Sequence, residues 1–80
     1  MNPDEIRSTV LSVLGEIAPE ADPSTLEPDV SFREQLDIDS MDFLNFAIAL
    51  HERLGIEIPE EDYAKLDTLD DAVEYLSHAS

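Results

Sequence analysis

Ser40 is the residue of this 80-residue chain best placed for covalent chemistry, because it stands between two acids, Asp39 and Asp42, at the predicted start of a helix. It is poorly equipped as an enzyme nucleophile. No G-x-S-x-G motif surrounds it, and the only two histidines, His51 and His78, lie far along the chain. As a site of modification it is better placed, since an attached phosphate would meet the positive end of the helix dipole. A serine that caps the helix or merely occupies its first turn is the alternative.

The acidic stretch around this serine could suggest a metal site, so we compared it with a calcium-binding loop. Counted from Asp37, position six is Asp42 instead of the required glycine, and position twelve is Ile48 instead of glutamate. The motif fails. His51 has no second ligand at a metal-binding spacing, and we expect it to be half-buried and bonded to a loop carbonyl. The sequence predicts no metal centre and no catalytic residue.

The composition limits both the size of the protein and its partners. The chain has 20 Asp and Glu against 4 Lys and Arg, a formal net charge of −16. Nucleic acids and anionic membranes repel such a chain, whereas a basic protein surface complements it. Residues 1–80 are enough for a single small domain, and Leu, Ile, Val and Phe make up 23 of the 80 residues, enough for a folded core.

The compartment follows from what the chain lacks. It contains no cysteine, which excludes a disulfide scaffold and a thiolate nucleophile. Its first five residues have neither the basic region nor the apolar run of a signal peptide. No apolar stretch approaches the roughly 20 residues that span a bilayer. We therefore expect a cytoplasmic monomer that does not insert into membranes.

Periodic apolar residues predict an all-α fold. Helices are expected over 3–17 and 39–54, a short third helix begins near Pro59, and a last helix begins near Thr68. Asn2, Asp39 and Gly55 occupy capping positions. The sum is a four-helix bundle with three main helices, one short helix and a long loop between the first two.

The long loop, residues 18–38, contains three prolines and shows no sustained period. One ordered turn is expected within it, because Ser31 and Glu34 match a capping box. Phe32 and Leu36 would then face the interior. A loop of this length in so small a domain is either functional or a sign that an element has been missed.

The helix over 40–54 carries an unusually wide apolar face. On a helical wheel its apolar residues cover an arc of about 220°, whereas a surface helix needs a stripe only slightly wider than about 100°. Such a helix either lies at the centre of the core or exposes apolar side chains to a ligand or partner. Met41 and Ile48 lie together at one edge of the arc and are expected to reach solvent.

The residues around Ser40 give the chain a resemblance to a known family. Residues 36–41 read Leu-Asp-Ile-Asp-Ser-Met, followed fifteen residues after Ser40 by Gly55 and nineteen after it by Pro59. The tripeptide at 39–41 is a weak motif by itself, but at a helix start, with this spacing and in an acidic 80-residue chain, it is similar to the acyl carrier proteins. The likeness extends over essentially the whole chain.

The resemblance implies a four-helix carrier without catalysis of its own. A separate magnesium-dependent phosphopantetheinyl transferase would esterify Ser40 with 4′-phosphopantetheine from coenzyme A, and the arm would hold acyl groups as thioesters in fatty-acid, lipid or related biosynthesis. The apolar arc would line an expandable space for the acyl chain. Acyl synthases, ligases or transferases would dock through basic surfaces. The docking surface expected around Ser40 consists of Asp37, Asp39, Met41, Asp42 and Ile48.

The chain also departs from the family pattern. Asn45, His51 and Arg53 stand where the family usually has acids, and Phe43 would add bulk beside the attachment site. These departures favour a specialised carrier with a dedicated synthase or ligase. Two alternatives stay open: an aminoacyl or peptidyl carrier of the same plan, and an unmodified acidic adaptor that binds a basic protein.

Overall fold

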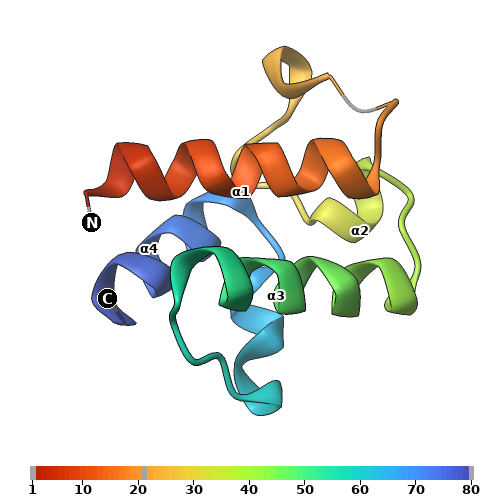
Figure 1. Ribbon diagram of the computed structural model, residues 1–80. Helices are drawn as coiled ribbons and strands as arrows, with labels where there is room; N and C mark the ends of the chain where they lie inside the picture. Colours follow the sequence, from red (N-terminus) through yellow and green to blue (C-terminus); the bar gives the residue numbers. More distant parts are fainter. Residues whose placement is uncertain (1, 21, 80) are drawn as a thin grey trace.

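The chain is all-helical in the computed structural model, which describes residues 2–20 and 22–79 (Figure 1). In chain order, the α-helices are α1 (Pro3–Ile17), α2 (Phe32–Gln35), α3 (Ser40–Leu54) and α4 (Leu69–Ala79), and the 3₁₀ segments are η1 (Pro23–Thr25) and η2 (Glu60–Leu66). No β-strand occurs in either described range. The predicted all-α bundle is confirmed: α1, α3 and α4 are the main helices, η2 is the expected short one, and the long connection between α1 and α3 contains η1 and α2.

α1 begins and ends where the sequence predicts. The Asn2 side chain caps it by accepting a hydrogen bond from the Glu5 N–H at 2.9 Å. Pro3 occupies the first turn, where a missing N–H costs nothing because helix starts leave these donors unpaired. The helix stops at Ala18, directly before a proline. Its buried face consists of Ile6, Val10, Val13 and Leu14.

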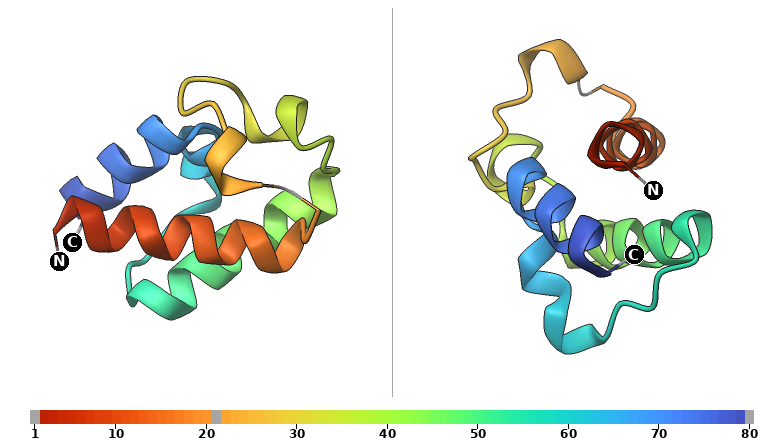
Figure 2. Two further views of the ribbon diagram at one scale, coloured as in Figure 1. Left: turned by 90° about the horizontal axis from the view of Figure 1, so that it is seen from above. Right: turned by 90° about the vertical axis from the view of Figure 1, so that its left-hand side faces the viewer.

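α1 is the element that joins the bundle, because it packs against both α3 and α4. α1 and α3 run in opposite directions, so the end of α1 and the start of α3 lie at the same side of the molecule (Figures 1 and 2). η2 packs against α4 more extensively than against α3. The start of α3 lies at one side of the bundle (Figure 1).

Aromatic side chains link α2 and α3 inside the core. Phe32 of α2 meets Phe46 of α3 edge to face, with ring centroids 5.5 Å apart. Phe43 lies 5.9 Å from Phe46 between centroids. Phe32 is fully buried and Leu36 is half-buried, so both face inward as predicted. The other fully buried large side chains are Ile6, Val10, Val13, Leu50, Leu66, Leu69 and Leu76.

The capping box expected at Ser31 is wrong, although the helix it was meant to start, α2, is present. The Ser31 side chain makes no capping hydrogen bond and instead donates to Oδ2 of Asp67 at 2.7 Å. A capping serine would accept the Glu34 N–H with its Oγ, but that N–H donates to the Ser31 carbonyl at 3.1 Å. The hydroxyl instead makes a charge-assisted bond to the carboxylate. The Phe32 N–H donates to the Asp67 carbonyl at 2.6 Å. These bonds hold the long connection against the junction between η2 and α4.

η2 is held to α4 by one side-chain hydrogen bond. The Tyr75 hydroxyl donates to Oδ2 of Asp62 at 2.7 Å. This bond, together with burial and the charges of Asp62 and Glu61, raises the pKa of Tyr75 to about 12. The same hydrogen bond, assisted by the charge of Lys65, outweighs desolvation and lowers the pKa of Asp62. The predicted short third helix is thus present, as a 3₁₀ segment that Pro59 precedes.

Candidate functional site

Ser40 is the first residue of α3, and it is exposed. The helix begins there because Asp39 caps it, with Oδ1 accepting a hydrogen bond from the Asp42 N–H at 2.9 Å. The predicted cap is confirmed. Within the described residues no hydrogen bond or ion pair engages the Ser40 hydroxyl. Its oxygen is therefore open to chemistry supplied from outside the chain.

The histidines do not provide Ser40 with a base. His51 lies about 16 Å further along the helix axis, and its Nδ1–H donates to the Ile56 carbonyl at 2.7 Å. The predicted bond to a loop carbonyl is confirmed, although the residue is exposed rather than half-buried. His78 belongs to the last turn of α4. Across residues 2–20 and 22–79, no group of three or more His, Cys, Asp or Glu could hold a metal ion.

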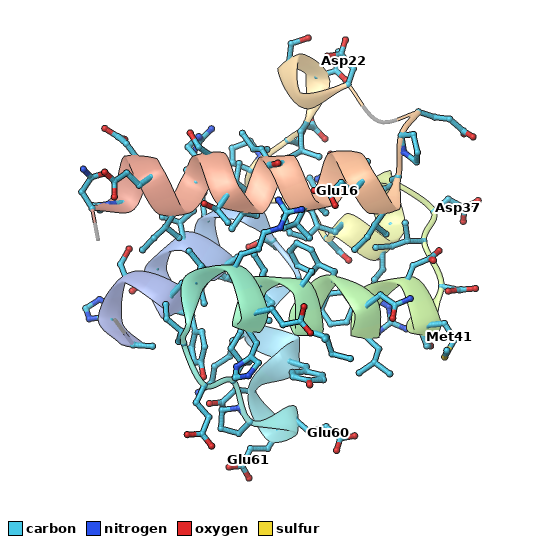
Figure 3. All side chains as sticks on the ribbon, viewed as in Figure 1. Glu16, Asp22, Asp37, Met41, Glu60 and Glu61 are labelled. Carbon is cyan, nitrogen blue, oxygen red and sulfur yellow. The ribbon has the colours of Figure 1, made fainter. Side chains whose placement is uncertain are left out.

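Three carboxylates surround the start of α3. Asp37 and Asp39 are exposed and Asp42 is half-buried. Asp37 has φ of 52°, a left-handed conformation that aspartate tolerates better than most residues. Figure 3 shows its side chain on the loop before α3, pointing away from the bundle. No ion pair within the described residues involves these acids, so the negative charge beside Ser40 is not neutralised by salt bridges inside the fold.

An apolar stripe of Met41, Leu44 and Ile48 lies exposed along α3. Their exposed fractions are 65%, 36% and 41%, and their spacing of three and four residues puts them on one face of the helix. Figure 3 shows Met41 at the start of α3, pointing away from the bundle. The prediction that Met41 and Ile48 reach solvent is confirmed. Leu44 was missed, although the same helical spacing could have revealed it.

The rest of the apolar arc of α3 faces the core. Phe43, Phe46, Ala47 and Leu50 are buried. Phe43, which was expected to add bulk beside the attachment site, is part of the core: its ring is only 7% exposed and packs against Phe46. The exposed side of that ring is covered by Arg33 of α2, whose guanidinium carbon lies 5.7 Å from the ring centroid. The sequence analysis did not find this contact.

The surface of the bundle has several hollows, of which two bear on the site. One, of about 380 Å³, borders the start of α3 and is lined in part by Ile17, Leu36 and Ile38 together with Asp37 and Asp42. The other, of about 630 Å³, lies between η2 and α4. Apolar surface therefore lies beside the acids at the start of α3.

The C-terminal end of α3, the far end from Ser40, contacts α1 through Arg53. Arg53 forms an ion pair with Glu16 and also donates to Oγ of Ser12 at 3.3 Å. Glu16 is on α1, as Figure 3 shows. This contact gives a structural reason for a basic residue at a position where the family pattern has an acid.

The chain matches a known protein family over most of its length. The family described as "Phosphopantetheine attachment site" matches residues 4–76. The acyl carrier protein of Thermosynechococcus vestitus is 35% identical over 78 residues, which cover 98% of this chain and 95% of that protein. The meromycolate extension acyl carrier protein of Mycobacterium tuberculosis is 34% identical over 73 residues, 91% of this chain and 63% of that protein.

A solved structure agrees. The solution structure of an Anaplasma phagocytophilum protein, described as belonging to the acyl carrier proteins, superimposes with a TM-score of 0.80 at 32% identity and covers 100% of this chain and 94% of that one. Fold and match together define a phosphopantetheine-bearing domain. The chain belongs to the acyl carrier protein family, whose proteins are carriers with covalently attached 4′-phosphopantetheine. None of its helices in the described ranges is both long and apolar enough to cross a membrane.

Proposed function

We propose that residues 1–80 act as one carrier domain that holds acyl groups as thioesters on a 4′-phosphopantetheine arm attached to Ser40. One observation carries the proposal: Ser40 is exposed at the start of α3, and its hydroxyl has no hydrogen bond to any residue that the structure describes. The family of the chain bears this group. The N–H groups of the first turn favour a negatively charged phosphodiester at this position. The residues present therefore fit the group.

The attachment needs a separate enzyme. Oγ of Ser40 would form the bond to phosphorus while 3′,5′-ADP leaves coenzyme A, and the hydroxyl proton would pass to a base of the magnesium-dependent transferase, because no histidine of this chain is near. When attached, the group supplies a thiol, which the chain itself lacks since it has no cysteine. The role of the chain is to present the arm, and the bond-making steps belong to its partners.

The surroundings of Ser40 support docking of basic partners. Asp37, Asp39 and Asp42 form an acidic edge that would attract Lys and Arg side chains and accelerate encounter. The apolar stripe beside it would supply the area that a partner buries. The proposed docking surface thus keeps the five predicted residues, Asp37, Asp39, Met41, Asp42 and Ile48, and adds Leu44. Synthases, ligases and acyltransferases of fatty-acid or lipid synthesis are the proposed partners.

The cargo is proposed to be a fatty acyl group. The Mycobacterium tuberculosis relative is named for meromycolate extension, which points to lipid chemistry rather than to amino acids. The same relatives weigh against an aminoacyl carrier. The proposed compartment is the cytoplasm, consistent with a chain that has no cysteine for a disulfide scaffold.

Intact-mass measurement tests the attachment. The purified chain is incubated with coenzyme A, magnesium and a broad-specificity phosphopantetheinyl transferase, and Ser40→Ala serves as the matched control. The expected result is a gain of one phosphopantetheine unit in the wild-type chain and none in the variant. No gain in a folded, previously unmodified wild-type chain would contradict the carrier proposal and favour the acidic adaptor.

A further inference from the structure

Arg33 is the basic side chain that contacts the beginning of α3. Its guanidinium covers the ring of Phe43, which is three residues after Ser40. The three other Lys and Arg residues lie elsewhere, with Arg7 in the first half of α1, Arg53 paired with Glu16 and Lys65 paired with Asp62. Arg33 is therefore the cation of the described chain best placed to act at the start of α3.

The charge of Arg33 is not used inside the fold. The residue is exposed, and its contact within the described residues is with the neutral ring of Phe43 rather than with a carboxylate. A guanidinium stacked on an aromatic ring still presents its N–H groups outward, and its planar fork matches phosphate oxygens. The guanidinium of Arg33 thus packs on an aromatic ring, and its N–H groups are available to bind an anion.

A phosphodiester on Ser40 would need such a cation. It would place a negative charge among Asp37, Asp39 and Asp42, which repel it. Phe43 lies three residues after Ser40, within about one turn of the helix start, so the contact of Arg33 is with the first turn of the helix that begins at Ser40. The guanidinium of Arg33 is thus placed over the first turn of α3, whose first residue is Ser40.

We infer that Arg33 binds the phosphodiester that joins 4′-phosphopantetheine to Ser40, an inference that rests on the proposed attachment. Arg33 is then a positioning residue: it offsets the local acids and fixes the first bond of the arm relative to α3. The ring of Phe43 is the surface on which the Arg33 guanidinium packs.

The direct test is the ¹⁵N NMR signal of the arginine side chains before and after modification. Arg33→Lys identifies the Arg33 Nε–H signal by its loss. The expected result is that this signal shifts on modification and exchanges more slowly with water, while the signals of Arg7 and Arg53 stay in place. An unmoved Arg33 signal in a chain whose mass shows full modification would overturn the inference and leave the attachment itself intact.

Thermal unfolding gives a second test through the difference in Tm between modified and unmodified protein. In the wild-type chain that difference should be small, whereas in Arg33→Gln modification should lower the Tm by about 2–5 °C more. Arg7→Gln removes the same charge at a distant site and should behave like the wild type, and Arg33→Lys should be intermediate. The extra loss should shrink at 0.5 M salt, on the order of three times physiological ionic strength. Equal differences in Arg33→Gln and wild type would overturn the inference.

The two proposals fail in different ways. If Ser40 is not the attachment residue, Ser40→Ala still gains mass, and the carrier proposal fails first. If Ser40 is modified but the Arg33 signal and the Tm difference do not respond, only the role of Arg33 is lost. Each variant is compared with its own unmodified form, so a general loss of stability in Arg33→Gln cancels.

Discussion

The two ends of α3 differ in whether their polar side chains are bonded within the fold. At the far end, the His51 ring bonds to the Ile56 carbonyl, and Arg53 is bound to α1 through Glu16 and Ser12. At the near end, the Ser40 hydroxyl has no partner within the described residues, and the acids around it form no salt bridge there. Asp39 is the exception, because it caps the helix.

This difference places the proposed function at the near end of α3. The composition of the helix alone does not distinguish the two ends. Both ends carry charged and polar residues, yet those at the far end stabilise the contact of α3 with α1 and with the following loop. Those at the near end are exposed and available, next to the apolar stripe of Met41, Leu44 and Ile48. Substitutions at the near end should therefore change partner reactions, and substitutions at the far end should change stability.

The largest effect is expected from a charge placed in the apolar stripe. Ile48 lies two turns from Ser40, so Ile48→Asp leaves the attachment chemistry untouched. The substitution removes apolar area that a partner would bury and adds a negative charge to the docking surface. The kcat/KM of the phosphopantetheinyl transferase should fall about tenfold, the loss typical of one interface residue that matters. The Tm should change little, because the residue is already 41% exposed.

Ser8→Asp is the matched control, since it adds the same charge at an exposed position of α1. Equal rates for the two variants would show that total charge, rather than the stripe, governs the reaction. That outcome would remove the functional half of the comparison between the two ends of α3.

The next largest effect is a loss of stability at the far end of α3. Gly55 ends α3 with φ of 66°, a left-handed conformation that costs an alanine about 1 kcal/mol. No atom would obstruct an added methyl group, so the cost is that of the backbone alone. Gly55→Ala should lower the Tm by about 4–8 °C in thermal unfolding and leave the transferase rate unchanged. A large loss of rate with an unchanged Tm would reverse the assignment of the two ends.

Helix ends were predictable from the sequence because their chemistry is local. Asn2 bonds to an N–H three residues later, Asp39 does the same, and Gly55 was marked by its lack of a side chain. The family resemblance likewise depended on short spacings around Ser40, and Ser40 as the attachment residue stays a prediction.

Contacts between distant residues were not predictable in the same way. Ser31 is hydrogen-bonded to Asp67, 36 residues away, and local spacing instead suggested a capping box. The Arg53–Glu16 pair and the stacking of Arg33 on Phe43 also require the packed bundle. A helical wheel shows which side chains share a face, but it does not show which neighbours cover them. Leu44 was missed for this reason.

A smaller loss of stability is expected at Arg53. Its side chain and that of Glu16 are 40% and 58% exposed, so solvent screens the ion pair and limits it to about 0.2–1 kcal/mol. Arg53→Gln should lower the midpoint of urea unfolding slightly at low salt and not at high salt. Modification of Ser40 should proceed at the wild-type rate. A rate defect would mean that the far end of α3 also contacts the transferase.

The smallest effect concerns pH and the bond between η2 and α4. The pKa of Tyr75 is raised from 10.0 to about 12, so the bond to Asp62 stabilises the fold fully below about pH 10 and is lost as the pH rises through 12. The difference in urea midpoint between the wild type and Tyr75→Phe should therefore shrink between pH 10 and 12. A difference that stays constant over this range would show that the hydrogen bond contributes nothing.

The central claim is that the free hydroxyl at the near end of α3 bears the cofactor. Fragmentation of the modified chain by tandem mass spectrometry tests it most directly, because it locates the added group among all the serines. The account predicts that the phosphopantetheine is found on the peptide containing Ser40, and on no peptide containing Ser31, whose hydroxyl is bound to Asp67. The group on any serine other than Ser40 would contradict the account.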